Sequence, residues 1–78
     1  MSKLQAMING TIMRMSEASY LAESWHHTMC KMYKNEVPYV EVQTAYKISD
    51  MYAKECQSCY KMLKQLAKLQ SKERAING

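Results

Sequence analysis

The sequence predicts an all-α fold: a long antiparallel helical hairpin with a short or kinked N-terminal helix, assembling into a homo-oligomeric helical bundle. Three observations lead to this prediction. The 78 residues include one proline and two glycines, whereas a sheet protein needs turn residues every ~8–12 positions. Apolar residues recur at alternating steps of three and four along two long segments, which is the pattern of amphipathic helices. The single strong break, Glu36-Val37-Pro38, lies near the middle of the chain.

The N-terminal segment, residues 1–10, is expected to form a short helix or a kink. Asn9-Gly10 is a helix-stop signal, because both residues tolerate the left-handed conformation. Thr11 is predicted to be the N-cap of the next helix, over residues 11–35. The row of residues on the side of that helix predicted to pack consists of Thr11, Met15, Ala18, Ala22, Trp25, Met29 and Met32.

Residues 36–38 are predicted to form the loop, and residues 39–76 the second helix. Proline disfavours the helical conformation in the residue before it and suits the first helical position. About 38 residues at 1.5 Å each give a helix of ~57 Å. Its apolar stripe consists of Val42, Ala45, Ile48, Tyr52, Cys56, Cys59, Leu63, Leu66 and Leu69.

A loop this short forces the two helices to pack antiparallel, so that positions whose numbers sum to about 74 lie side by side. Large residues then meet small ones, as close packing requires: Trp25 falls beside Ser49, and Ala22 beside Tyr52. Several apolar residues stay outside this contact, namely Met13, Tyr20, Leu21, Tyr39, Tyr46 and Tyr60. A single domain of this length buries only ~60% of its unfolded surface. We therefore expect a homodimeric four-helix bundle or a higher assembly.

Two groups of potential metal ligands are present: the pair Cys56 and Cys59, and the pair His26 and Cys30 one helical turn apart. In a hairpin the first pair faces residues 15–18, ~15 Å from His26, so one chain does not bring the two groups together. Both members of the first pair lie on the apolar stripe, where a free cysteine commonly fills small spaces. Core packing is the favoured interpretation, and no metal or cofactor is expected. A site shared between two copies is the alternative.

The chain lacks the signatures of a catalytic site. It has no glycine-rich phosphate loop, no nucleophile elbow and no clustered carboxylates, so we expect a protein that is not an enzyme. The three cysteines are an odd number, and no apolar run has the length of a signal peptide or a membrane span. We expect a reducing, cytoplasmic setting and no membrane partner.

Positive charge is concentrated toward the C-terminus. Of the net charge of +4, residues 1–58 contribute none, while residues 59–78 carry five cations against Glu73 alone. Lysines recur every seven residues, in a line with ~10 Å steps. The predicted ligand-binding residues are Tyr46, Lys47, Lys54, Tyr60, Lys61, Lys64 and Lys68. Lysine neutralises phosphate and tyrosine can stack on a base, although the same residues also suit a solvated face beside a second helix contact.

The segment Ala53-Lys54 followed by Gln57, Tyr60 and Leu63, in a small chain rich in methionine and lysine, resembles the helical-hairpin sponges of phages and mobile elements. Those proteins oligomerise and trap cyclic-nucleotide signals of host immunity. The resemblance is one of architecture, and no site residue is carried over from it. It implies a counter-defence protein in the host cytoplasm.

We expect a non-catalytic helical oligomer that binds or sequesters a phosphate-bearing ligand, either a nucleotide signal or a nucleic acid. The alternative is a protein–protein inhibitor or adaptor that docks an amphipathic helical face on a host protein, since adaptable methionines suit a repacking interface. Sequence-specific DNA recognition is not indicated, because the lysine spacing is not a base-reading motif.

Overall fold

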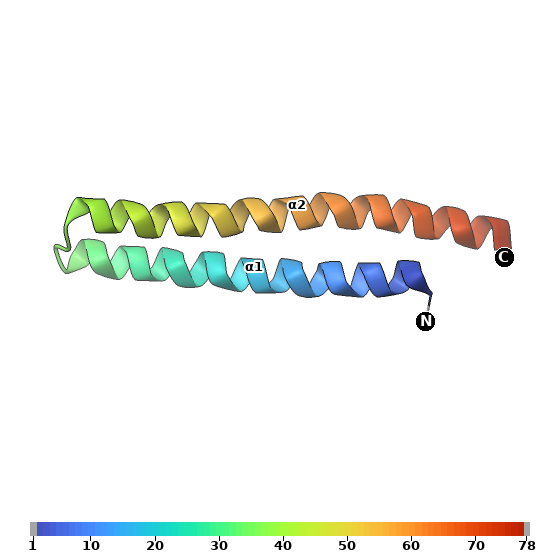
Figure 1. The fold of residues 1–78 in the computed structure, drawn as a ribbon, viewed down its shortest axis with the longest axis horizontal. Helices are drawn as coiled ribbons and strands as arrows, with labels where there is room; N and C mark the ends of the chain where they lie inside the picture. The colour runs from blue at the N-terminus through green and yellow to red at the C-terminus, as the bar shows by residue number, and fades with distance from the viewer. Residues whose placement is uncertain (1, 78) are drawn as a thin grey trace.

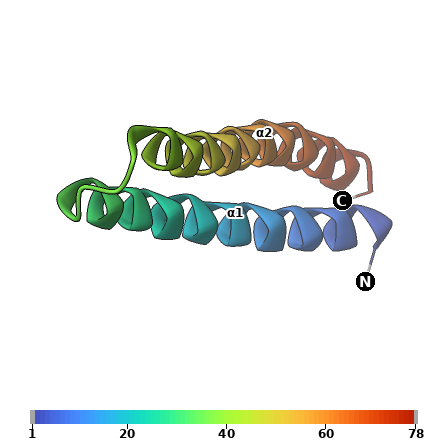
Figure 2. The ribbon, with the colours of Figure 1, turned by 60° about the vertical axis from the view of Figure 1, so that its left-hand side comes forward.

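The computed structural model of the protein describes residues 2–77. It consists of two helices, α1 (Lys3–Lys34) and α2 (Tyr39–Asn77), with no strand among the described residues. The helices run antiparallel as an extended hairpin of 60 × 17 × 14 Å (Figure 1). Figure 2 shows from a second direction that they lie side by side. The predicted helical hairpin is confirmed.

The helix α1 is continuous, so the prediction of a separate short helix over residues 1–10 was wrong. The helix passes through Asn9 and Gly10 without a break (Figure 1), and Gly10 does not adopt a positive φ. The reason is that Leu4 and Ile8 extend the three- and four-residue spacing back from Thr11, and both are half-buried. Their burial outweighs the cost of about 1 kcal/mol that a glycine adds in a helix interior.

Ser2, and not Thr11, is the N-cap of α1. The Oγ atom of Ser2 accepts a hydrogen bond from the Gln5 N–H at 3.0 Å, which satisfies one of the free donors of the first turn. Thr11 is only 6% exposed, and its hydroxyl donates to the Met7 carbonyl oxygen at 2.8 Å. The predicted capping role of Thr11 was therefore wrong, because the helix had already begun two turns earlier.

A Schellman motif ends α1 at the C-cap Asn35. The Val37 N–H donates to the Met32 carbonyl oxygen at 3.1 Å, and the next residue back, Glu36, donates to the Tyr33 carbonyl oxygen at 3.3 Å. Glu36 holds the left-handed position of the motif, with a φ of 57°. This conformation costs a residue with a Cβ atom about 1–2 kcal/mol. The loop therefore begins at residue 35, one residue earlier than predicted.

Pro38 precedes α2, and the break predicted there is confirmed. Its carbonyl oxygen accepts the N–H groups of Glu41 at 3.0 Å and Val42 at 3.3 Å, and proline has no N–H of its own to leave unpaired at this position. At the other end of α2, Gln70 Nε2 donates to Gln5 Oε1 at 2.6 Å. This contact places the N-terminal end of α1 beside residue 70. The last turns of α2 therefore extend past the N-terminal end of α1 (Figure 1).

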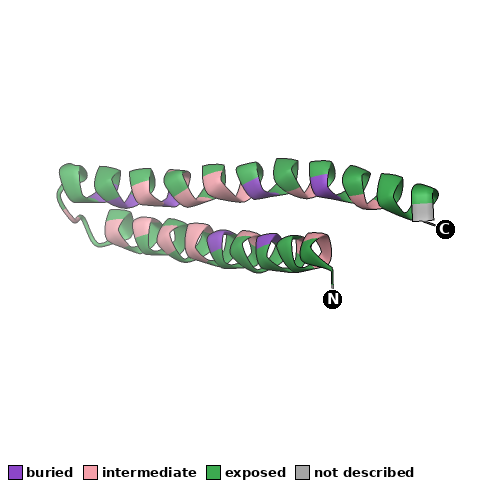
Figure 3. Ribbon diagram, turned by 45° about the vertical axis from the view of Figure 1, so that its right-hand side comes forward, coloured by how far each residue is buried: buried purple, intermediate pink, exposed green. Residues whose placement is uncertain are grey.

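The two helices meet along a single row of residues on each, which we call the seam. Its members are buried or half-buried and follow alternating steps of three and four. They are Leu4, Ile8, Thr11, Met15, Ala18, Ala22, Trp25, Met29 and Met32 on α1, and Val42, Ala45, Ser49, Tyr52, Cys56, Cys59, Leu63, Leu66 and Gln70 on α2. Figure 3 shows the buried positions on the facing sides of the two helices.

The seam confirms seven of the nine positions predicted for the apolar stripe of α2 and corrects two, Ile48 and Leu69. Ser49 takes the seam position next to Ile48, which lies half-buried beside the seam. Leu69 was predicted to belong to the stripe, but it is 52% exposed. The step of four from Leu66 reaches Gln70, so Leu69 lies beside the seam rather than on it. Ser49 is buried at 9% exposure, and its hydroxyl donates to the Ala22 carbonyl oxygen at 2.8 Å. That contact lies within one turn of the predicted neighbour, Trp25.

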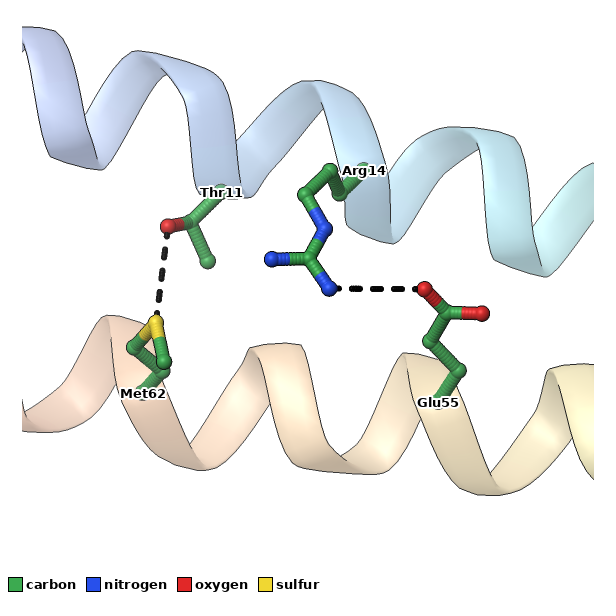
Figure 4. Close-up of polar contacts among 4 residues, drawn as sticks. All are labelled: Thr11, Arg14, Glu55 and Met62. Carbon is green, nitrogen blue, oxygen red and sulfur yellow. Dashed lines mark hydrogen bonds and ion pairs between the residues drawn. The ribbon is translucent and has the colours of Figure 1, made fainter.

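Two polar contacts cross one side of the hairpin. Thr11 Oγ1 lies 3.8 Å from Met62 Sδ, and Arg14 forms an ion pair of 3.5 Å with Glu55 (Figure 4). The side chains of Arg14 and Glu55 are 63% and 43% exposed. An ion pair this accessible to water stabilises a fold by at most ~1 kcal/mol. The contact therefore contributes little to stability, but it shows that Arg14 of α1 lies beside Glu55 of α2.

The hairpin leaves much apolar surface in contact with water. Its accessible surface is 6334 Å² for a mass of 9.1 kDa, whereas a compact protein of that mass exposes ~4,900 Å². Met13, Tyr20 and Tyr39 are each at least 70% exposed. Despite this apolar surface, no stretch within the described residues of either helix is long and apolar enough to cross a membrane.

Candidate functional site

The seven predicted ligand-binding residues lie on α2 outside its contact with α1. We call this set the lysine–tyrosine face: Tyr46, Lys47, Lys54, Tyr60, Lys61, Lys64 and Lys68. All seven are exposed. The seam residues Ala45, Cys59 and Leu66 are buried. One or two positions after each of them in the sequence comes a residue of the lysine–tyrosine face, for example Lys47 after Ala45. In a helix, each position turns the side chain by about 100°, which carries these residues away from the seam.

Four lysines form the central line of this face. Lys47, Lys54, Lys61 and Lys68 repeat at seven-residue steps, so each stands ~10 Å from the next and the line is ~32 Å long. A helical residue two positions after a seam residue points almost directly outward. The structure therefore presents the four ammonium groups to solvent along one edge of the molecule.

Aromatic rings flank this line. Tyr46 and Tyr60 are 55% and 54% exposed, so each residue keeps about half of its surface open to water. Lys64 Nζ lies 4.7 Å from the centroid of the Tyr60 ring, a cation–π contact worth ~0.5–1 kcal/mol at an exposed site. The contact holds one cation next to a flat ring, an arrangement that can meet a phosphate and a base together.

The charge of the face is uneven along its length. Lys54 forms an ion pair of 3.0 Å with Asp50, the carboxylate four residues before it on the same side of α2. From residue 59 onward the one carboxylate is Glu73, which continues the seam spacing after Gln70 and so lies away from the lysine line. The strongest positive potential is thus expected between Lys61 and the end of α2.

Three cations outside the predicted set lie at the same end of the hairpin: Lys3, Arg74 and the exposed Lys72. Arg74 follows Tyr60 by two seven-residue steps and therefore shares its side of α2, while Lys3 is brought there by the antiparallel contact of Gln5 with Gln70. Lys3 and Arg74 are exposed as well. The seven-residue spacing identifies Arg74 from the sequence, whereas Lys3 is found only once the register of the hairpin is known.

The lysine–tyrosine face is convex. A shallow depression in the groove between the helices is lined by residues outside this face, among them Arg14, Leu21 and Tyr52. Small ligands bind mostly in concave sites that enclose them. A convex line of cations within one hairpin is better matched to an extended anion than to a small molecule.

The potential metal ligands fall into two separate places, as expected. Cys59 is buried and Cys56 half-buried in the seam, in agreement with their predicted packing role. His26 and Cys30 are exposed on α1, with 3.9 Å between His26 Nε2 and Cys30 Sγ. Within residues 2–77, no three His, Cys, Asp or Glu side chains are arranged to hold a metal ion.

Comparisons of the chain with models of known protein families, with curated proteins and with solved structures gave no match.

Proposed function

We propose that this protein is a non-catalytic, homo-oligomeric helical protein that binds single-stranded nucleic acid along the lysine–tyrosine face. The observation that carries the proposal is the straight line of four exposed lysines on the side of α2 opposite the seam. The tyrosines beside that line give bases a surface to stack on. Oligomerisation would place several such lines on one particle.

Self-association is supported by the exposed area. The hairpin exposes ~1,400 Å² more than a compact protein of its mass, which exceeds the ~800 Å² that each partner buries in a standard interface. Large apolar side chains outside the lysine line are exposed, for example Met13, Tyr20, Tyr33 and Tyr39. A second copy that covers these side chains leaves the lysines free.

The spacing of the lysines favours a polymer over a single nucleotide. Steps of ~10 Å mean that the phosphates of one nucleotide reach one or two of the lysines, whereas a strand that follows α2 meets all four. Each phosphate neutralised on a single strand contributes about −0.7 to the slope of log K against log salt. Four contacts therefore predict a slope of about −3.

The test is the salt dependence of binding to a fluorescently labelled, uridine-rich RNA, measured by anisotropy. The double variant Lys61→Gln/Lys68→Gln should weaken binding and reduce the magnitude of the slope by about 1.4. The matched control is Lys31→Gln/Lys34→Gln, which removes the same charge from exposed positions of α1 near the loop. The control should keep the wild-type slope, and circular dichroism should show all three proteins equally helical.

Equal slopes in the two double variants would contradict the proposal, because binding would then depend on total charge and not on the face. Competition separates the two kinds of phosphate ligand. If a free mononucleotide or cyclic nucleotide displaces the RNA at equal phosphate concentration, the ligand is a nucleotide signal, and the counter-defence role implied by the resemblance gains support. If only polymers compete, the nucleic-acid proposal stands.

The second candidate is a protein–protein inhibitor or adaptor. The observation in its favour is the position of Met13 and Tyr20, seven residues apart on α1 and 73% and 70% exposed. A partner groove can bury such a pair of apolar anchors. Tyr20→Asp should then abolish the complex with a host protein while RNA binding is unchanged. A complex that dissociates with rising salt and survives Tyr20→Asp would point back to the lysine–tyrosine face.

A further inference from the structure

The geometry points to a metal half-site at His26 and Cys30: we infer that two copies of the chain together bind one thiophilic divalent cation, such as Zn²⁺, through these two residues of each copy. The inference rests on the self-association proposed above. It concerns a different part of the molecule from the lysine–tyrosine face.

The two ligand atoms lie close to the separation that a tetrahedral zinc ion requires. In a tetrahedral zinc site with Zn–S of ~2.3 Å and Zn–N of ~2.05 Å, the sulfur and nitrogen atoms are ~3.6 Å apart. His26 Nε2 and Cys30 Sγ are 3.9 Å apart, so a shift of a few tenths of an ångström lets both ligate one ion. Two ligands four residues apart on one helix share a face, as in helical zinc-binding motifs.

The His26–Cys30 pair is accessible to an ion from solvent. Both side chains are exposed, and they line a shallow depression together with Glu23, His27 and Ser49. The depression opens to solvent beside α2, so an ion and a second protein chain can reach it. By contrast, the thiol of Cys59 is buried and is closed to an incoming ion.

One hairpin does not supply all the ligands of such a site. Ser49 contacts Ala22, four residues before His26, and Cys56 lies seven residues beyond Ser49 in the opposite direction. Cys56 is therefore ~16 Å along the hairpin from the level of His26. No third ligand converges on the pair within the described residues. Structural zinc sites take four ligands, and two pairs related by a two-fold axis supply a His₂Cys₂ set.

The surroundings of the pair suit an interface between copies. Tyr33 is 76% exposed and stands one heptad after His26, while Tyr39 is 72% exposed at the start of α2. A second copy seated here covers both rings. The basic end of α2, from Lys61 onward, is ~18 Å from Ser49 along the helix, so the metal-linked contact leaves it accessible.

The test uses Co²⁺ as a spectroscopic substitute for Zn²⁺, on the reduced full-length chain in the absence of other metals. Binding replaces the S–H bond of each Cys30 by an S–Co bond and releases its proton to the buffer. We expect a thiolate-to-cobalt absorption band in the near ultraviolet, intense visible bands of tetrahedral cobalt, and a stoichiometry of one ion per two chains.

The variants His26→Ala and Cys30→Ser should weaken cobalt binding at least ~100-fold, since even residues that only orient metal ligands cost 10–100-fold when changed. The matched controls are His27→Ala, the same residue type one position along, and Cys56→Ser on α2. Both controls should keep the absorption bands and the stoichiometry. The inference would be overturned by any of three results. These are an equal loss of cobalt affinity in His27→Ala, a stoichiometry of one ion per single chain, and the absence of a thiolate band in the wild type.

Failure of this inference can be told apart from failure of the proposed function. Sedimentation in the presence of a chelator reports assembly without metal, and RNA anisotropy reports the lysine–tyrosine face. A chain that assembles and binds RNA but takes up no cobalt contradicts the half-site alone. A chain that stays monomeric with and without cobalt contradicts both the half-site and the proposed assembly.

Discussion

Replacing Glu36 by glycine should stabilise the hairpin, although it removes a side chain and adds no contact. Glu36 occupies the left-handed position of the Schellman motif with a φ of 57°, where the Cβ atom costs about 1–2 kcal/mol. Glycine adopts this conformation without strain but loses ~0.5–1 kcal/mol more than other residues through backbone entropy. Removing a negative charge from a helix C-terminus adds a few tenths of a kcal/mol in the same direction.

The sum predicts a net gain of about 0.5–1 kcal/mol for Glu36→Gly, which raises the melting temperature by ~3–6 °C in a chain of this size. The assay is thermal and urea unfolding followed by circular dichroism, at one fixed protein concentration for all variants. The hydrogen bonds of the motif use backbone N–H groups of Glu36 and Val37, so they survive the substitution.

Two controls isolate the backbone effect. Glu36→Gln removes the charge and keeps the Cβ atom, so it should gain no more than a few tenths of a kcal/mol. Asn35→Gly places the glycine at the preceding residue, whose φ is −89°; with no strain to relieve there, it should destabilise the hairpin by ~0.5–1 kcal/mol. If Glu36→Gly is no more stable than the wild type, the left-handed assignment of residue 36 is refuted.

Two further substitutions probe α1 and the seam. Gly10→Ala should stabilise the hairpin by about 1 kcal/mol in the same unfolding assay, because Gly10 is helical and an added Cβ atom meets nothing within 4 Å. A loss of stability in this variant would mean that α1 is interrupted at residue 10. Leu66→Ala should lower the free energy of unfolding by ~2–4 kcal/mol, since Leu66 is 5% exposed. Leu69→Ala, at a position 52% exposed, should lower it by less than ~1 kcal/mol. Equal losses of stability would show that Leu69 is buried by the seam or by another copy.

The hairpin could be predicted from the sequence because its determinants are local. Pro38 and the residues before it break an otherwise continuous helical pattern, and Asn35 provides the C-cap. The three- and four-residue spacing then determines which side of each helix is apolar. The contact of Ser49 with Ala22 lies within one turn of the register obtained by folding the chain about its loop.

Other features depend on competition between local and long-range interactions, which residue types alone do not resolve. Asn9-Gly10 permits a helix stop, but burial of Leu4 and Ile8 in the seam favours continuing the helix. Leu69 has the right chemistry for the core and lies one position away from the seam. Both outcomes were decided by packing between helices.

The lysine–tyrosine face illustrates the same division. The seven-residue spacing of Lys47 and its three successors was sufficient to place them on one side of α2. The contribution of Lys3 to the basic end required the antiparallel register, and the 3.9 Å approach of His26 to Cys30 required side-chain conformations. Spacing along a helix is visible in a sequence, whereas distances across helices and between side chains are not.

The most direct test of the account is the mass of the chain in solution, by sedimentation or native mass spectrometry at micromolar concentration, in a chelating buffer and with nucleic acid removed. We predict a defined oligomer whose mass is a multiple of 9.1 kDa, because the hairpin exposes ~1,400 Å² more than a compact protein of its mass, and each partner in a standard interface buries ~800 Å². A single species of 9.1 kDa at every concentration would contradict it, and the exposed tyrosines and methionines would then need another partner.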